Sequence, residues 1–193
     1  MKIVSLVVAS TLVLSSASLL AASGREDSVE RLQAAAEVLH SIQEAPDHGI
    51  PNSVLDDTKC IIVVPHLIKG GFVFGAKHGR GVATCRTADG WSAPAFISVG
   101  GGSWGLQIGV EEVDLVMLVM NDRGVQHLLS SKFELSGEGA VVEQDNDSTW
   151  AIYDHEPSFR NVLSGRVAVP ESADSFLKEV NHDSARAREE ASK

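Results

Sequence analysis

Residues 91–110 read WSAPAFISVGGGSWGLQIGV and are followed directly by EEVDLVMLVM, residues 111–120. Aromatic and β-branched residues on both sides of a glycine-rich turn are typical of a β-hairpin, so we expect two strands that fold back on each other across 100–103. Leu106, Ile108 and Val110 alternate with less apolar residues, which predicts one apolar face on the second strand. This hairpin is expected to be the centre of the fold, and the earlier part of the chain should supply strands that pair with it.

Short β segments separated by glycine and proline precede this hairpin. The segments expected to be strands are 60–64, 71–76 and 81–86. Connections this short join antiparallel strands, so the sequence predicts an antiparallel meander rather than βαβ units. The run 113–120 is apolar on both faces, which predicts a central and covered strand.

Helical patterns flank this β-rich region. Apolar residues recur at helical spacing across 28–43 and predict an amphipathic helix with Ser28 as its N-cap. Asn121 is the expected N-cap of a helix after the central strand, and 171–191 predicts a C-terminal helix. The tail of that helix, residues 182–193, is highly charged and is expected to fray.

The region between the last two helices is expected to add further strands. Residues 139–144 and 150–155 predict a strand pair around the polar turn 145–148, and 162–169 predicts a weaker strand. The whole pattern indicates an α+β fold with an antiparallel sheet, and its length suits one domain.

The first 23 residues have the composition of a secretory signal peptide. Lys2 precedes an apolar run, and small residues close that run at Ala22 and Ser23. We therefore expect an exported protein, periplasmic or secreted, with residues 24–193 as its single domain. A retained membrane anchor is the alternative, because an apolar run of about 20 residues is just long enough to span a bilayer.

The chain is acidic, with 26 Asp and Glu against 16 Lys and Arg and a formal net charge of −10, which argues against nucleic-acid binding. Residues 58–88 nevertheless contain no acidic side chain. Four basic residues fall at expected strand ends and turns of this segment: Lys69, Lys77, Arg80 and Arg86. Basic side chains beside a phosphate-bearing surface contribute about 1 kcal/mol each, which makes these four the candidate site for lipid or another anion. The alternative is that they are solvated edge charges that discourage strand aggregation.

Cys60 and Cys85 are the only two cysteines, and export would permit a disulfide between them. Closing a loop of about 26 residues stabilises a fold by roughly 3.5 kcal/mol in the chain-entropy model. If a third strand separated theirs, their Cα atoms would lie about 9 to 10 Å apart, beyond the usual disulfide reach of about 4.4 to 6.8 Å. Two interpretations of these cysteines therefore stay open: a disulfide, or two small buried free thiols.

Residues 101–105, GGSWG, match the G-x-S-x-G pattern of a nucleophile elbow, which makes Ser103 the candidate nucleophile of a serine hydrolase. That pattern needs a helix after the serine, but the residues from Leu106 onward predict another strand, so a turn serine is favoured. The seven histidines show no HxH, HExxH or paired-thiol spacing. We therefore expect neither a metal site nor a cofactor.

Three motifs follow one another between residues 50 and 121: IPNSVLDDTKCIIVVP, KGGFVFGAKHGRGVATCR and GWSAPAFISVGGGSWGLQIGVEEVDLVMLVMN. In this order they resemble the SYLF domain family, a lipid-binding and actin-binding module of eukaryotic membrane-trafficking proteins and of exported bacterial proteins. The resemblance implies an α+β domain around an antiparallel, barrel-like sheet, without catalysis. It also implies binding to anionic lipid, which is a phosphoinositide in the eukaryotic members.

The chain departs from the family at both ends. Past Gly137 the family's Gly-Leu-Phe-Ala-Gly motif and Leu-Glu-Gly turn are absent, and residues 161–169 read NVLSGRVAV instead. The basic N-terminal helix of the lipid-binding members has no counterpart, because residues 25–44 hold two basic and five acidic side chains. An exported protein would also rarely meet phosphoinositides or actin, so neither ligand is carried over to this chain.

The sequence therefore favours a non-catalytic, exported module that binds anionic lipid, a membrane surface or a related anionic amphiphile through the four basic residues. A structural or protein-interaction role in the cell envelope is the alternative, and a hydrolase at Ser103 is the third hypothesis.

Overall fold

Strands β1 and β2 form the centre of the fold, and the other strands join by pairing with them or with their neighbours. The computed structural model describes residues 2–45, 49–71, 74–104, 109–130, 132–135 and 139–191. The elements are, in chain order, α1 (Lys2–Glu44), α2 (Asn52–Asp57), β1 (Cys60–Gly71), β2 (Phe74–Thr87), β3 (Gly90–Trp91), β4 (Ala95–Trp104), β5 (Gly109–Val119), α3 (Asp122–Leu128), β6 (Lys132–Leu135), β7 (Ala140–Gln144), α4 (Asn146–Tyr153), α5 (Phe159–Leu163), the 3-10 helix η1 (Glu171–Ala173) and α6 (Asp174–Ala191).

All strand pairs are antiparallel, and the sheet has the order β5-β1-β2-β4-β7-β6, with β3 paired to β2. The order of the first four is that of a Greek key, because β5 returns to the outer side of β1 instead of pairing with β4. The predicted α+β class, the antiparallel sheet and the N-terminal and C-terminal helices are confirmed. The sheet is open rather than barrel-like, since its outermost strands β5 and β6 do not pair with each other in the described residues.

The predicted hairpin at residues 91–110 is wrong. Its glycines lie inside strand β4, which pairs with β2 on one side and β7 on the other, while β5 pairs with β1. Close strand packing requires glycine at 101, because a Cβ on Gly101 would lie 2.8 Å from the Cα of Ala140. The expected alternation at Leu106 and Ile108 lies outside the described residues.

Strand β5 is an edge strand, so the prediction that 113–120 is central and covered is wrong. The residues of its second half are half-buried, and Met120 keeps 38% of its surface exposed. The apolar run has β1 as its single neighbouring strand in the described structure. Side chains on both faces of this run, at 113 and 115–119, are partly buried against the core.

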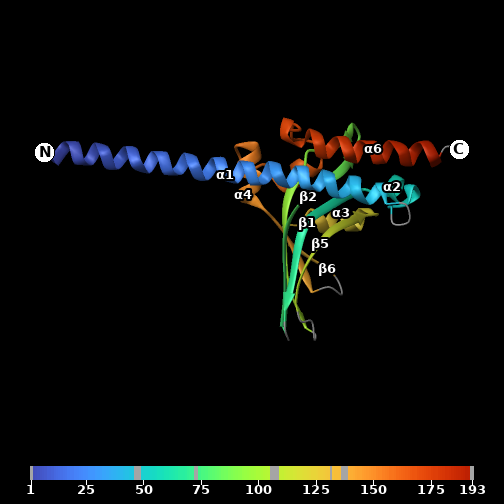
Figure 1. Cartoon of the computed structure of the whole chain (residues 1–193). Coiled ribbons are helices and arrows are strands. Elements are labelled where there is room, and N and C mark those ends of the chain that lie inside the picture. Colours follow the sequence, from blue (N-terminus) through green and yellow to red (C-terminus); the bar gives the residue numbers. More distant parts are fainter. Residues whose placement is uncertain are drawn as a thin grey trace.

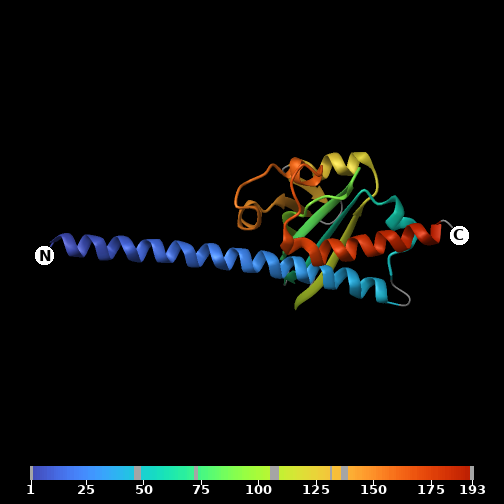
Figure 2. The same cartoon turned by 90° about the horizontal axis from the view of Figure 1, so that it is seen from above.

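Helices α1 and α6 lie side by side across one face of the sheet, and α2 packs against α6 (Figures 1 and 2). Leu32, Ala35 and Leu39 of α1 are buried, which confirms the amphipathic helix. Ser28 is not its N-cap, because α1 begins at Lys2 and the Ser28 hydroxyl donates to the Gly24 carbonyl at 2.7 Å. Among the residues whose side chains the structure describes, no helix is long and apolar enough to cross a membrane.

The region after β5 contains more helix than the sequence indicated. Asn121 caps α3 as predicted, with its Oδ1 atom accepting from the Gly124 N–H at 2.9 Å. The strand predicted at 139–144 is confirmed as β7, but its partner is β6, and 150–155 belongs largely to helix α4. The expected strand at 162–169 is also wrong, since the chain forms α5 and then an extended stretch there. Helix α6 continues to Ala191, and the fraying expected for the tail stays a prediction.

Cys60 and Cys85 are directly opposed in the register of β1 and β2, and the structure contains a disulfide between them. Their Cα atoms are 4.0 Å apart, near the roughly 4.5 Å spacing of a non-hydrogen-bonded antiparallel pair. The meander with an intervening third strand, which would have separated them, does not occur.

Candidate functional site

The far end of the sheet projects away from the helices (Figure 1). A pair of lysines lies in this part of the sheet. This region, called the distal sheet, consists of residues 68–71, 75–78, 100–102 and 109–112. Lys69 and Lys77 are register partners on β1 and β2. Directly opposed residues share one face of a sheet, with Cβ atoms about 4.5 to 5.5 Å apart, so both ammonium groups can reach the same small anion.

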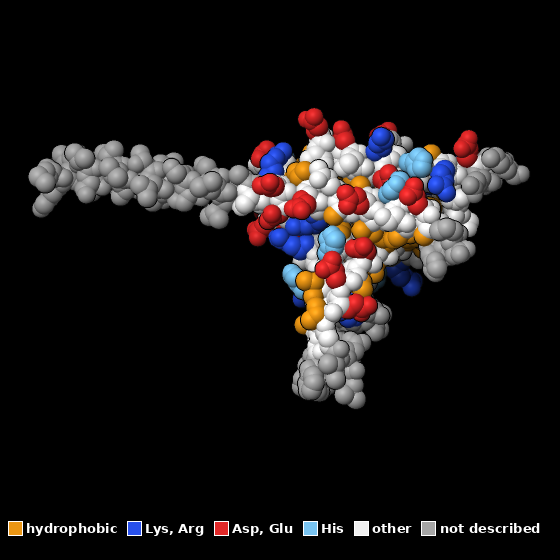
Figure 3. Space-filling model, viewed as in Figure 1, with side chains coloured by type: hydrophobic (Ala, Val, Ile, Leu, Met, Phe, Trp, Pro, Cys, Tyr) orange, Lys and Arg blue, Asp and Glu red, His pale blue; other side chains and the backbone are white. Residues whose placement is uncertain are grey.

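The other face of the distal sheet carries two exposed apolar side chains next to His78 and Glu112. Ile68 is 48% exposed and Val110 is 81% exposed. Val110 pairs with Gly70, so its side chain shares a face with Ile68 and lies opposite the lysines. Figure 3 shows apolar and charged side chains together on the projecting part of the sheet. The distal sheet therefore combines a pair of neighbouring lysines with exposed apolar side chains.

Three exposed carboxylates of β5 lie in or next to this region: Glu111 and Glu112 belong to the distal sheet, and Asp114 follows it. Glu111 is the register partner of Lys69 on the outer side of β1. Glu112 lies 2.7 Å from Nδ1 of His66, and Asp114 accepts from the His66 N–H at 3.0 Å. These contacts hold the irregularity between Val64 and Leu67 in β1, where His66 has a φ of 53°.

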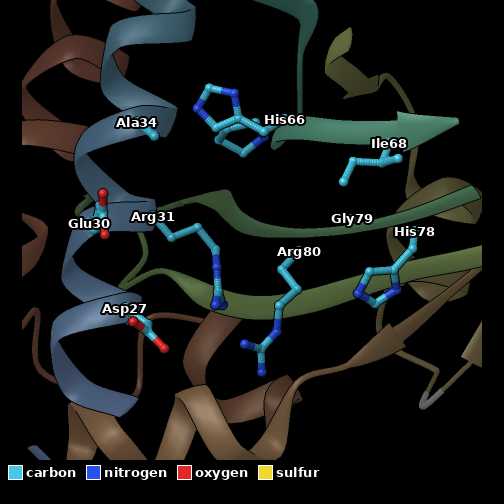
Figure 4. Close-up of a pocket in the computed structure, with 10 residues that line it drawn as sticks. Asp27, Glu30, Arg31, Ala34, His66, Ile68, His78, Gly79 and Arg80 are labelled. Carbon is cyan, nitrogen blue, oxygen red and sulfur yellow. The ribbon is translucent and has the colours of Figure 1, made fainter. Parts of the chain in front are cut away.

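A cleft of about 350 Å³ separates α1 from the sheet and is lined by charged side chains of both signs. Figure 4 shows Arg31 of α1 and Arg80 of β2 extending in the same direction within it. Both reach Asp145, the N-cap of α4: Arg31 Nη1 and Arg80 Nε lie 3.2 and 3.1 Å from its Oδ2. Asp27 and Glu30 also line the cleft, so it is not a simple anion site.

The three charged groups Arg31, Arg80 and Asp145 differ in burial, and this difference affects the pKa of Arg31. The Arg31 and Asp145 side chains are 9% and 5% exposed, whereas Arg80 is 43% exposed. Burial lowers the pKa of Arg31, and the charge of Arg80 lowers it further, while Asp145 opposes both effects. Asp145 also accepts hydrogen bonds from the Ser148 N–H and hydroxyl at 3.1 and 2.8 Å. The carboxylate thus ties α1, β2 and α4 together.

Arg86 lies near the C-terminal end of β2, where its side chain is bound to neighbouring parts of the fold. Its guanidinium donates to the carbonyls of Leu55 and Thr58, both at 2.8 Å, and lies 4.6 Å from the centre of the Trp91 ring. Burial lowers the pKa of Arg86, and the nearby Arg188 adds to this effect. The side chain anchors the end of α2 to the sheet.

The four basic residues predicted as one site therefore do not form a single patch. Lys69 and Lys77 are adjacent, but Arg86 lies nine positions further along β2 than Lys77, a span of roughly 30 Å. Alternation also places Arg80 and Arg86 on the opposite face of β2 from Lys77. Arg31 and Asp145 were not among the predicted site residues, because no local sequence pattern relates residues 114 positions apart.

Ser103 lies in strand β4 as the register partner of Gly75, and the next described element is strand β5. A nucleophile elbow needs a helix directly after its serine. The described residues do not provide that arrangement.

A family model described as Ysc84, Las17-binding protein actin regulator, matches residues 100–141. Human SH3 domain-containing YSC84-like protein 1 is 34% identical over 148 residues, which cover 74% of this chain and 40% of the human protein. The chain belongs to the SYLF domain family.

The SYLF domain described here is also similar to the rat YSC84-like protein 1, with 38% identity over 148 residues, covering 74% of this chain and 40% of the rat protein. Protein YSC84 of Saccharomyces cerevisiae is 26% identical over 176 residues, covering 68% of this chain and 37% of the yeast protein. The chain thus spans about two fifths of the length of the curated relatives it matches. No solved structure matches it. The family-model match covers the end of β4, all of β5 and α3, and β6.

Proposed function

We propose that this SYLF domain is a non-catalytic module that binds anionic lipid, or a related anionic amphiphile, at the distal sheet. The observation that carries the proposal is the opposed pair Lys69 and Lys77, with exposed Ile68 and Val110 on the other face of the distal sheet. Two ammonium groups on one face can donate to one phosphate, since charge-assisted hydrogen bonds are the stronger ones. The apolar side chains can lie against the acyl boundary of the same surface.

Arg80 and Arg86 have secondary roles in this proposal. Arg80 is bound to Asp145 but keeps enough exposure to contact a ligand that enters the cleft. Arg86 already donates to two backbone carbonyls, so its removal should affect stability before it affects binding. The proposal includes export to the periplasm or the medium after removal of residues 1–23, which intact-mass measurement of the exported protein would test.

Co-sedimentation with vesicles tests lipid binding. We expect the protein to bind phosphatidylcholine vesicles that contain about one third phosphatidylglycerol, and to bind pure phosphatidylcholine weakly. The double variant Lys69→Ala/Lys77→Ala should bind roughly 30-fold more weakly, because each basic residue near an anionic surface contributes about 1 kcal/mol. Added salt should weaken the binding of the wild type.

The matched control is Lys59→Ala/Lys178→Ala, which removes the same charge from two exposed lysines outside the distal sheet. It should bind like the wild type. Equal losses in both double variants would show that net charge alone controls binding, and the distal sheet would then have no special role. No binding to anionic vesicles would contradict the proposal itself.

A protein-interaction role in the cell envelope is the second candidate, and the exposed edge of β5 favours it. An edge strand presents unpaired backbone groups that a strand of another protein can pair with. The matching family is described as a Las17-binding protein and actin regulator, which supports a protein partner of some kind. The substitution Met117→Lys on this half-buried edge should abolish capture of an envelope protein and leave vesicle binding unchanged. Loss of vesicle binding with unchanged capture of the envelope protein would favour the lipid site.

A further inference from the structure

One turn of α6 brings three potential metal ligands together on the side of the domain opposite the distal sheet. A ligand atom from each of Glu179, His182 and Asp183 lies within 4.8 Å of the other two. The Nδ1 atom of His182 and the Oδ1 atom of Asp183 are 3.6 Å apart. Glu179 stands three residues before His182 and four before Asp183 on the helix, so its side chain neighbours both of them.

Asp183 is the unusual member of this group. Its side chain is 3% exposed, and its Oδ1 atom has no hydrogen-bond partner among the described residues. The separation of 3.6 Å from His182 is too long for a hydrogen bond. Buried carboxylate oxygens are normally paired with a donor or bound to a metal. The unsatisfied oxygen is directed into the cluster, which points to a ligand there.

Helix α1 places His40 and Glu44 next to this cluster. His40 Nδ1 lies 3.0 Å from Oε1 of Glu179, and His40 Nε2 lies 3.4 Å from Glu44. Three carboxylates, from Glu44, Glu179 and Asp183, thus meet two imidazoles where the two helices pack. A cation would offset the repulsion of these carboxylates.

We propose that Glu179, His182 and Asp183 form a binding site for a divalent transition-metal ion, with Zn²⁺ as the best-fitting ion. Tetrahedral Zn²⁺ with bonds of about 2.0 to 2.2 Å separates its ligand atoms by roughly 3.4 Å, so a small movement of the side chains brings all three into place. Imidazole favours Zn²⁺ over Mg²⁺ or Ca²⁺, which prefer oxygen ligands alone. Water takes the fourth position.

His40 is a positioning residue in this site. A ligating carboxylate is usually oriented by a hydrogen bond from an outer group, and His40 holds Glu179 in this way. Because His40 belongs to α1, the metal would also strengthen the packing of α1 on α6.

Titration of the chelator-treated full chain with Zn²⁺, followed by calorimetry and thermal unfolding, tests the proposal. We expect one high-affinity ion per chain, and a rise in Tm of about 5 to 10 °C at a free Zn²⁺ concentration one hundred times Kd. His182→Gln and Asp183→Asn should each weaken binding at least tenfold, and His40→Ala should weaken it about 10-fold to 100-fold. Co²⁺ should give a visible absorption band in the wild type and lose it in Asp183→Asn.

Asp183→Asn also separates a metal site from a purely structural cluster. In metal-free protein this variant should raise Tm, because it removes a buried carboxylate oxygen that lacks a hydrogen-bond donor. A free Zn²⁺ concentration one hundred times the wild-type Kd should offset that advantage, because it stabilises the wild type more than the weaker-binding variant. The matched control is His66→Gln, which removes an exposed histidine of β1 that lies beside the Glu112 carboxylate of β5. This variant should bind Zn²⁺ like the wild type. Absence of Zn²⁺ binding, or binding changed less than threefold by both ligand substitutions, would overturn the proposal.

Discussion

Removal of the Asp145 carboxylate should be among the most destabilising single changes in this domain. In Asp145→Ala, Arg31 loses its buried partner, which typically costs about 3 to 5 kcal/mol. Helix α4 also loses its N-cap hydrogen bond to the Ser148 N–H, which costs about 1 kcal/mol. The expected loss is therefore roughly 4 to 6 kcal/mol, comparable with the entire stability of many domains, which lies at about 5 to 15 kcal/mol.

Urea unfolding followed by tryptophan fluorescence measures this loss as a fall in the transition midpoint at constant m. Asp145→Asn keeps an oxygen that can cap α4 but loses the negative charge, so it should cost about 1.5 to 3 kcal/mol, the usual contribution of a charged hydrogen bond. Glu143→Ala is the control, because it breaks the exposed Lys132–Glu143 ion pair at 2.7 Å and should leave the midpoint nearly unchanged. A cost below about 2 kcal/mol for Asp145→Ala would refute the role assigned to the carboxylate. A second test is Arg31→Met/Asp145→Leu, which should recover much of the stability by removing both charges.

Three further predictions concern the sheet and the pH dependence. Cys60→Ala/Cys85→Ala should lower the free energy of unfolding by roughly 3.5 kcal/mol, measured by the same urea titration under non-reducing conditions, and a negligible loss would contradict the bridge. Gly101→Ala should lower Tm by several degrees, because its Cβ meets the backbone of β7, and an unchanged Tm in a calorimetric scan would contradict that close packing. Tyr153 is the single tyrosine and donates to the Pro94 carbonyl at 2.6 Å, and burial raises its pKa. The stability that this group contributes is complete below the unfolded-state pKa of about 10 and is lost as pH rises above that value. Absorbance at 295 nm should therefore show that Tyr153 ionises together with unfolding. The variant Tyr153→Phe should lack this part of the pH dependence.

Local patterns predicted the parts of the fold that depend on neighbouring residues. The helical spacing of Leu32, Ala35 and Leu39 found the buried face of α1, and Asn121 correctly marked the start of α3. The strand expected at 60–64 was found within β1, but the separate strands expected at 71–76 and 81–86 were wrong, since residues 74–87 form the single strand β2.

Pairing between distant segments could not be predicted in this way. The apolar run of β5 looks the same in sequence whether one or two strands flank it. Gly100 and Gly101 indicate a turn as readily as a close approach of strands. Trp150 and Tyr153 favour a strand by propensity, and the N-cap at Asp145 makes their segment a helix instead.

The candidate site shows the same contrast between local features, which the sequence predicts, and pairing between distant segments, which it does not. Residue type identified Lys69 and Lys77, but only the register of β1 and β2 shows that they face each other. That register also separates them from Arg86. Arg31 and Asp145 meet only after α1 has packed on the sheet, so their ion pair leaves no trace in either local sequence.

The packing of α1 against α6 has a consequence for how the chain folds. His40 contacts Glu179 across 139 residues of sequence, and the first strand of the Greek key pairs with its last. Contacts this remote give a high contact order, which places folding on the millisecond-to-second scale rather than the microsecond scale of helical bundles. The apolar face of α1 is not fully covered until α6, the final element, has been synthesised, because α1 packs against α6 as well as against the sheet and α4. A chain truncated before α6 should therefore expose part of this face and associate through it, whereas one truncated after α6 should not.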